Sequence, residues 1–165
     1  MIVPKENINF SKHILISGNS EIERRKLLSK ILIKCNLETI VFPKSMKNFG
    51  EYINTIEKKK LFEPYYESNR KYNSNQILDF HIDWIAENNC LFVLEEFQNM
   101  DDNWNNEILR ILINNLETNN KSATKFILTI DDETKLINNL KEIVDVTNYK
   151  TKDQVVESNL QIINA

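Results

Sequence analysis

Short apolar runs alternate along the chain with longer segments in which apolar side chains recur every three or four positions. Runs of this length, rich in β-branched and aromatic residues and bounded by polar ones, are typical of strands buried in a sheet. The predicted strands are His13–Ser17, Thr39–Phe42, Cys90–Leu94, Lys125–Ile130 and Ile143–Val146. Strand, helix, strand in this order predicts a parallel sheet with right-handed crossovers.

The segments between these strands have the periodicity of amphipathic helices. The predicted helices are Glu21–Lys34, Phe49–Lys60, Gln76–Asn88, Trp104–Leu116 and Leu136–Leu140. The apolar face predicted for the first helix consists of Ile22, Leu27, Leu28, Ile31 and Leu32. Together these elements predict an α/β fold, a three-layer α/β/α sandwich around a mainly parallel five-stranded sheet.

Composition places the chain among ordinary globular proteins. Its 165 residues contain 41% hydrophobic and 27% charged residues, which predicts a single domain spanning 1–165. We expect residues 1–12 to form a leading arm and residues 150–165 a C-terminal segment, in which Val155–Ile163 is weakly amphipathic. No internal repeat and no linker divides the sequence.

The net charge of −3 argues against a surface that grips phosphate backbones unaided, so we expect any contact with nucleic acid to be indirect. Aromatic residues within 61–74 follow Lys58, Lys59 and Lys60, and two interpretations stay open. The aromatics form a stacking surface for nucleic acid, or they cover a sheet edge or an interface.

The chain begins without a long apolar signal region and contains no run of membrane-spanning length. Cys35 and Cys90 lie within or beside apolar runs, which predicts free thiols in a reducing compartment. We therefore expect a cytoplasmic protein that does not associate with membranes.

Candidate chemistry is concentrated where two predicted strands end. Glu95 and Glu96 directly follow the run Cys90–Leu94, and Gly18, Asn19 and Ser20 follow the first strand as a turn that also caps the next helix. Open α/β sheets bind ligands in the crevice at the carboxyl ends of their strands, which is where these residues would lie. The alternative is that the two acids are simply solvated.

Three stretches in this order carry a resemblance to a known family. Leu91-Phe-Val-Leu-Glu-Glu96 and the Phe-Gln-Asn-Met that follows resemble a Walker B strand, an apolar run closed by two acids. Phe126-Ile-Leu-Thr-Ile-Asp131 is similar to a sensor-1 strand, and residues 132–140 resemble the short helix after it. The chain thus looks like P-loop ATPases of the AAA+ kind, in particular clamp-loader subunits.

The resemblance implies roles for particular residues if the site is active. Glu95 would be the acid on the side of Mg²⁺, and Glu96 the catalytic acid that polarises the attacking water. Thr129 or Asp131 would lie near the sensor that contacts the terminal phosphate. Glu95 departs from the aspartate usual at its position, and its extra methylene would displace the metal shell.

The phosphate loop departs further from the family pattern, so it is a degenerate Walker A motif. Gly18 holds the first glycine position, but Glu23, Arg24 and Arg25 replace the second glycine, the phosphate lysine and the magnesium-binding hydroxyl. Glycine lets successive N–H groups converge on a phosphate, whereas Glu23 would place a Cβ and a negative charge there.

These substitutions predict lost or altered nucleotide binding, so no cofactor is expected. If the loop does function, ATP with Mg²⁺ would be held by Gly18, Asn19, Ser20, Arg24 and Thr129. A simpler interpretation of Arg24 and Arg25 is an exposed helix face paired with Glu21 or Glu23. The alternative is a contact with an anion or with an acid of a partner.

Two further family features are missing from the expected places. The arginine-finger position before the predicted fifth strand contains Leu140-Lys-Glu-Ile143, and too few residues follow for the helical lid. The resemblance therefore favours a non-catalytic, pseudo-ATPase module that acts through protein contacts in a larger assembly, with DNA replication or defence as its setting. Clamp-loader-like complexes include subunits with inactive nucleotide sites.

Two alternatives stay open. One is an active Mg²⁺-dependent ATPase with an atypical phosphate loop. The other is an unrelated flavodoxin- or receiver-like binding domain. Strand order separates the second from the rest, because the fourth strand lies between the first and third in AAA+ folds, whereas the first and third are adjacent in receiver-like folds.

Overall fold

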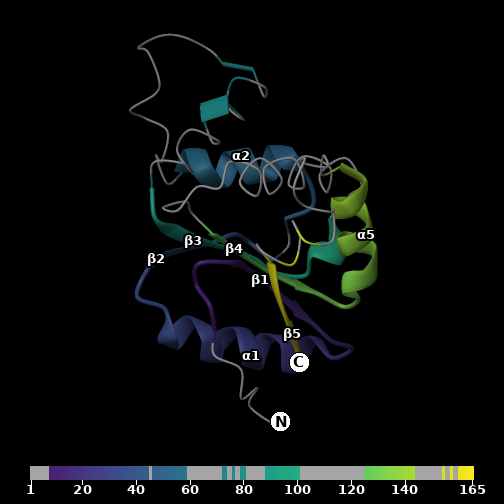
Figure 1. The fold of residues 1–165 in the computed structure, drawn as a ribbon. Coiled ribbons are helices and arrows are strands. Elements are labelled where there is room, and N and C mark those ends of the chain that lie inside the picture. The colour runs from purple at the N-terminus through teal and green to yellow at the C-terminus, as the bar shows by residue number, and fades with distance from the viewer. Residues whose placement is uncertain are drawn as a thin grey trace.

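In a computed structural model, five strands form one sheet in the order β2-β3-β4-β1-β5, and every neighbouring pair is parallel (Figure 1). The structure describes residues 8–44, 46–58, 72–73, 76, 79–80, 88–100, 125–143, 154, 157 and 160–165. The strands are β1 (His13–Ser17), β2 (Glu38–Val41), β3 (Cys90–Leu94), β4 (Lys125–Ile130) and β5 (Leu160–Asn164).

The position of β4 decides between the candidate folds. β4 pairs with β1 on one side and with β3 on the other, with Ile127 opposite both Ile14 and Val93. This order confirms the α/β sandwich of P-loop ATPases and excludes the flavodoxin- or receiver-like alternative, in which the first and third strands are adjacent. As predicted, β1 and β3 are buried along their whole length.

Helix α1 (Glu21–Lys34) packs on one face of the sheet, and α2 (Phe49–Lys58) and α5 (Glu133–Ile143) lie on the other side (Figure 1). Ser20 caps α1, acidic residues occupy its first turn and Lys34 its last, as the helix dipole favours. The sequence predicted both bounds of α1.

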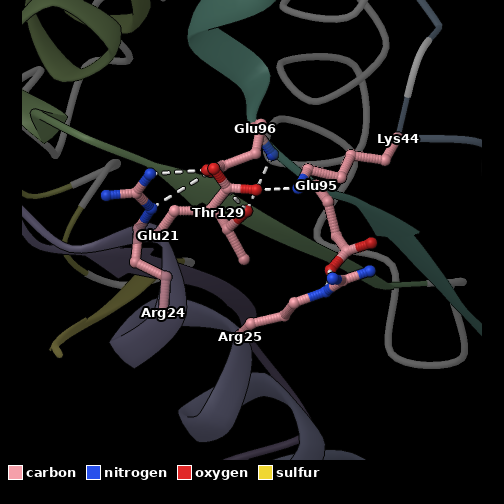
Figure 2. A pocket seen from close by; sticks show the side chains of 7 residues that line it. All are labelled: Glu21, Arg24, Arg25, Lys44, Glu95, Glu96 and Thr129. Carbon is pink, nitrogen blue, oxygen red and sulfur yellow. Dashed lines mark hydrogen bonds and ion pairs between the residues drawn. The ribbon is translucent and has the colours of Figure 1, made fainter.

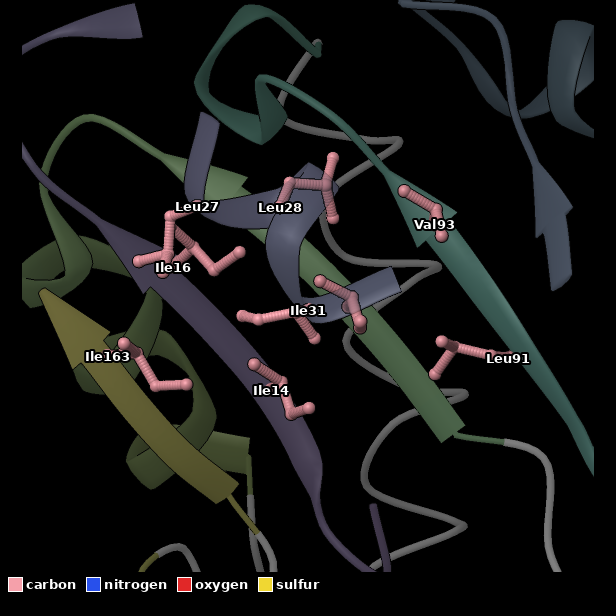
Figure 3. Close-up of a cluster of buried hydrophobic side chains, with 9 residues drawn as sticks. Ile14, Ile16, Leu27, Leu28, Ile31, Leu91, Val93 and Ile163 are labelled. Atoms are coloured by element: carbon pink, nitrogen blue, oxygen red, sulfur yellow. The ribbon is translucent and has the colours of Figure 1, made fainter. Parts of the chain in front are cut away.

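The core between α1 and the sheet consists of aliphatic side chains (Figure 3). Alternate residues of the strands point toward the helix, so that Ile14 and Ile16 lie on this face while the equally buried Leu15 does not belong to the cluster. The members are Ile14, Ile16, Leu27, Leu28, Ile31, Leu91, Val93, Ile127 and Ile163. Burying each side chain contributes about 1.5–3 kcal/mol, which fixes α1 across the middle of the sheet.

Aromatic rings fill the other side of the sheet. The ring of Phe42 stacks on the ring of Tyr52 from α2, with 4.6 Å between the ring centroids. The rings of Phe42 and Phe92 meet edge to face at a centroid distance of 5.4 Å, and those of Phe92 and Phe126 at 5.5 Å. These edge-to-face and stacked pairs tie α2 to the sheet.

The fifth strand was predicted in the wrong place. Ile143 ends helix α5 instead of starting a strand, and the strand that completes the sheet is Leu160–Asn164, inside the segment expected to be weakly amphipathic. α5 also begins at Glu133, three residues before the predicted start, because the Asp132 side chain accepts a hydrogen bond from the N–H of Thr134. Residues 140–143 therefore belong to α5 and do not lie immediately before the fifth strand, so the comparison with an arginine finger at 140–143 loses its basis.

Ile22 was wrongly assigned to the buried face of α1, since 66% of its surface is exposed. Several predictions fall mostly outside the described residues: the leading arm up to residue 7, the aromatic segment 61–74, the helices over 76–88 and 104–116, and residues 144–146. Within the part of the chain that the structure describes, no helix is long and apolar enough to cross a membrane.

Candidate functional site: ion pairs where a nucleotide site is expected

The carboxyl ends of β3 and β4 meet the first turn of α1, and seven side chains surround the hollow between them (Figure 2). They are Glu21, Arg24, Arg25, Lys44, Glu95, Glu96 and Thr129. The sheet order explains why: α1 follows β1, and β4, which ends beside Thr129, separates β1 from β3. The strand-end acids Glu95 and Glu96 therefore lie beside Arg24 and Arg25 of α1.

The loop between β1 and α1 does not have the shape of a phosphate cradle. It is limited to Gly18, Asn19 and Ser20, because α1 already begins at Glu21. The side-chain oxygen of Ser20 accepts a hydrogen bond from the N–H of Glu23 at 3.3 Å, and its carbonyl accepts one from the N–H of Arg24 at 3.0 Å. Two N–H groups that a P-loop would aim at phosphate are thus used by the helix itself.

Arg24 is the most buried cation of the site, with 4% of its surface exposed. Its Nε and Nη2 donate to the two carboxylate oxygens of Glu96 at 3.0 and 2.5 Å, and its Nη1 donates to the carbonyl of Gly18 at 2.5 Å. Dashed lines in Figure 2 mark the contact with Glu96. A bidentate arginine–carboxylate pair of this kind is the strongest ionic contact that side chains form.

The backbone of Glu96 is also held in place. It adopts a left-handed conformation with φ 55° and ψ 55°, which costs a non-glycine residue about 1–2 kcal/mol. The hydroxyl of Thr129 accepts a hydrogen bond from the N–H of Glu96 at 2.8 Å and donates to its carboxylate at 3.3 Å. The strained conformation turns the carboxylate toward α1 while the chain continues into a short 3-10 helix, Phe97–Asn99.

Glu96 is ionised at neutral pH. Burial alone would raise its pKa, but hydrogen bonds and charge from Arg24, with further hydrogen bonds from Gln98 and Thr129, hold the pKa below its ordinary value. The interpretation of Glu95 and Glu96 as solvated acids is therefore wrong for Glu96, only 4% of which is exposed. Arg24 is likewise not on an exposed helix face.

Two weaker ion pairs lie at the rim. Nε of Arg25 is 3.6 Å from a carboxylate oxygen of Glu95, and Lys44 contacts Glu21. The Arg25 side chain is 61% exposed, so solvent screens this contact far more than the buried pair. As one interpretation predicted, Arg25 does lie on an exposed face of α1, but its ionic partner is Glu95.

Six of the seven side chains around the hollow are joined in three ion pairs, and Thr129 is the seventh. The hollow among these described side chains has an empty volume of about 160 Å³, including open solvent. Pockets for small organic ligands are larger, about 300–1,000 Å³. Arg24, the residue expected to contact phosphate if the loop functions, is paired with Glu96, and Glu95, the acid expected on the side of Mg²⁺, is paired with Arg25. Among the described residues, no group of three His, Cys, Asp or Glu side chains lies together in a way that could hold a metal ion.

Gly18 and Asn19 do not line the hollow. Gly18 lies against the end of the sheet, where an added Cβ would come within 3.0 Å of the Ala165 carbonyl, and the Ala165 N–H donates to the Ser17 carbonyl at 2.7 Å. The φ of Gly18 is not positive, so the reason for a glycine here is the close approach of Ala165 and not the backbone conformation. Asn19 is exposed, and Ser20 serves as the cap of α1.

No role in the site was predicted for Lys44 or Gln98. Lys44 follows β2, and β2 lies beside β3, so its position was predictable only once the strand order was known. The Gln98 amide oxygen accepts from the N–H of Asp131 at 3.3 Å, which joins the segment after β3 to the segment after β4. Asp131, the second candidate for the sensor, is exposed, whereas Thr129 contacts Glu96 directly.

Comparison with known proteins supports the fold. Cdc6p from Pyrobaculum aerophilum aligns with a TM-score of 0.56 and 13% identity over 91% of this chain and 38% of that chain. A Walker-type ATPase of Pyrococcus abyssi aligns with a TM-score of 0.45 and 16% identity over 92% of this chain and 48% of that one. No protein-family model and no curated protein sequence matches the chain. The chain spans less than half of each structural neighbour. With the strand order, the similarity to Cdc6p supports the predicted α/β fold with its parallel five-stranded sheet.

Proposed function

We propose that this chain is a non-catalytic AAA+-like module, a pseudo-ATPase that acts through protein contacts in a larger assembly. The observation that carries the proposal is the bidentate contact between Arg24, at the position of the phosphate lysine, and Glu96, at the position of the catalytic acid. In an active enzyme the corresponding groups serve the nucleotide and the attacking water. Here each neutralises the other.

The energetic cost of opening this contact supports the proposal. Mg²⁺–ATP in the usual place would require Arg24 to leave Glu96, and removing one partner of a buried, hydrogen-bonded pair costs about 3–5 kcal/mol. Each 1.4 kcal/mol changes a dissociation constant tenfold, so nucleotide binding would be weakened roughly 10² to 10⁴ times. The Glu96 carboxylate left behind would also repel the phosphates.

The protein-contact part of the proposal rests on the resemblance to clamp-loader subunits, some of which have inactive nucleotide sites. A DNA-replication or defence assembly in the cytoplasm is the setting we propose. The competing proposal, an active ATPase with an atypical phosphate loop, requires Arg24 to exchange the two carboxylate contacts and the Gly18 carbonyl for phosphate oxygens.

ATP hydrolysis and thermal unfolding test the proposal together. We expect no turnover above the rate of the buffer with Mg²⁺, and no change in Tm with millimolar Mg²⁺–ATP, because a ligand stabilises a protein only when it binds the folded state. The matched variant is Glu96→Gln. Turnover by the natural sequence that disappears in Glu96→Gln, with ATP still raising Tm, would establish an active ATPase.

A further inference from the structure

Helix α1 is apolar on two opposite sides. Leu27, Leu28 and Ile31 face the sheet and are buried. On the outer side, Ile22 and Ile33 are 66% and 84% exposed, the largest exposures among the large hydrophobic residues that the structure describes. Isolated exposed apolar residues are common, but two on the same line of one helix form a pattern.

The exposed line has the spacing of a helix–helix seam. Residues 22, 26, 29 and 33 follow one another at intervals of four, three and four, which is the d-a-d-a spacing of a heptad repeat. Ile22 and Ile33 occupy the two ends, roughly 16 Å apart along the axis, with Lys26 and Ser29 between them. This length matches about one and a half heptads of a partner helix.

The charge around this line is positive. Helix α1 contains five basic and two acidic residues, although the whole chain has a net charge of −3. Arg24 is neutralised inside the site, whereas Arg25, Lys26, Lys30 and Lys34 are exposed. Among the described residues, Lys30 and Lys34 have no ionic partner. A partner lying on this side would meet uncompensated positive charge.

These features together select the occupant. A nucleic acid would use the cations but gain little from two isoleucines at the ends of the line. A second copy of α1 would match apolar residues but would bring two positively charged helices together, which is unfavourable. A helix with apolar residues at heptad spacing and acidic residues beside them satisfies both requirements.

We propose that the outer side of α1, the line of residues 22, 26, 29 and 33 with its flanking cations, is the docking surface for an acidic amphipathic helix of a partner protein. The proposal deepens the protein-contact part of the proposed function and rests on it. Ile22 and Ile33 supply the apolar anchors, and Lys30 and Lys34, which have no ionic partner among the described residues, fix the orientation through charge.

Two synthetic helical peptides of about three heptads test this surface by fluorescence anisotropy. Both have leucine at the seam positions, and the flanking positions are glutamate in one and lysine in the other. We expect the glutamate peptide to bind and the lysine peptide not to bind. Binding should weaken at least tenfold in Ile22→Ser/Ile33→Ser, and it should weaken with added salt because the flanking contacts are ionic.

The matched control is Val41→Ser, which removes an exposed apolar side chain from edge strand β2 and should bind like the natural sequence. Both substituted isoleucines are exposed, so circular dichroism should confirm folded variants. Failure of the glutamate peptide to bind, or equal binding by the double variant, would overturn the proposal. So would binding of a DNA duplex, or dimerisation in sedimentation, that the double variant abolishes.

The same variants separate this inference from the proposed function. Ile22→Ser/Ile33→Ser lies outside the ion-paired site, so its response to Mg²⁺–ATP should equal that of the natural sequence. If the peptides do not bind as expected and nucleotide also fails to bind, the docking surface is overturned but the pseudo-ATPase proposal is not. Nucleotide binding by every variant would overturn the proposed function instead.

Discussion

The carboxyl ends of β3 and β1 lie at the same edge of the sheet, but they differ in how closely they resemble a P-loop ATPase. At the end of β3, two acids follow a buried strand and a threonine of β4 reaches the second acid. At the end of β1, only Gly18, Asn19 and Ser20 separate the strand from α1, which already begins at Glu21. The end of β3 therefore keeps its resemblance to a Walker B strand and is called the preserved half of the site, whereas the end of β1 departs from a Walker A loop and is called the altered half.

This difference explains the geometry of the site. When residues 21–24 become helical, Arg24 lies on the same side of α1 as Leu27 and Leu28, because positions three and four apart share a helix face. That side faces the sheet, where Glu96 is the nearest counter-charge. Arg24, which belongs to the altered half, is therefore paired with Glu96 of the preserved half.

Arg24→Met would have the largest effect on this arrangement. The substitution leaves the Glu96 carboxylate buried without its cation, so we expect a loss of about 3–5 kcal/mol in the free energy of unfolding, measured by urea denaturation. Arg25→Met is the matched control, because that exposed pair is worth about 1 kcal/mol or less. The double variant Arg24→Met/Glu96→Leu should recover most of the loss. Equal effects of the two single substitutions would show that the buried pair is not special.

Acid should weaken the same contact. The pKa of Glu96 is lowered in the folded protein, so the pair stabilises it fully above the ordinary glutamate pKa of about 4.3 and loses this contribution as the pH falls through the lowered folded value. In Glu96→Gln this part of the acid dependence should be absent. The free energy of unfolding, measured by urea denaturation from neutral pH to below the ordinary glutamate pKa, checks the prediction. An equal loss of stability with falling pH in the natural sequence and in Glu96→Gln would contradict it.

Thr129→Val tests the preserved half. Valine has the same shape but cannot accept the hydrogen bond from the N–H of Glu96, and an unsatisfied buried donor costs about 1–3 kcal/mol. Thr129→Ser keeps the hydroxyl and should lose less. If valine and serine have equal effects in denaturation, packing and not the hydrogen bond holds Glu96 in its left-handed conformation.

Ser20→Ala tests the altered half and should have the smallest effect. Its side chain caps α1 at the N–H of Glu23, and the loss of such a cap costs about 1 kcal/mol. Ser29→Ala, at an exposed position within the same helix, is the control and should change the free energy of unfolding by less than about 0.5 kcal/mol. A negligible effect of Ser20→Ala would mean that the cap does not determine where α1 begins.

Much of the fold could be predicted because local signals agreed with it. The strands β1, β3 and β4 are apolar runs ended by polar residues, and α1 has a cap at Ser20, so their bounds follow from the sequence. The fifth strand was misplaced because the short apolar runs at 143–146 and 160–163 look alike, and only the pairing of Leu160–Asn164 with β1 distinguishes them.

The sequence indicated several residues that lie in the site, but it did not indicate which of them contact one another. Strand ends identified Glu95 and Glu96, but the pairing of Glu96 with Arg24 joins residues 72 positions apart, which no local pattern specifies. A signal for the burial of Arg24 did exist, since it shares a helix face with Leu27 and Leu28. Ile22 was misassigned for the related reason that α1 has apolar residues on both sides.

Calorimetric titration of Mg²⁺–ATP tests the central claim most directly, which is that the contact between Arg24 and Glu96 takes the place of nucleotide. The claim predicts no heat of binding at millimolar nucleotide, for the natural sequence and for Arg24→Ala alike. Tight binding by the natural sequence that Arg24→Ala weakens would contradict it, because Arg24 would then be holding phosphate.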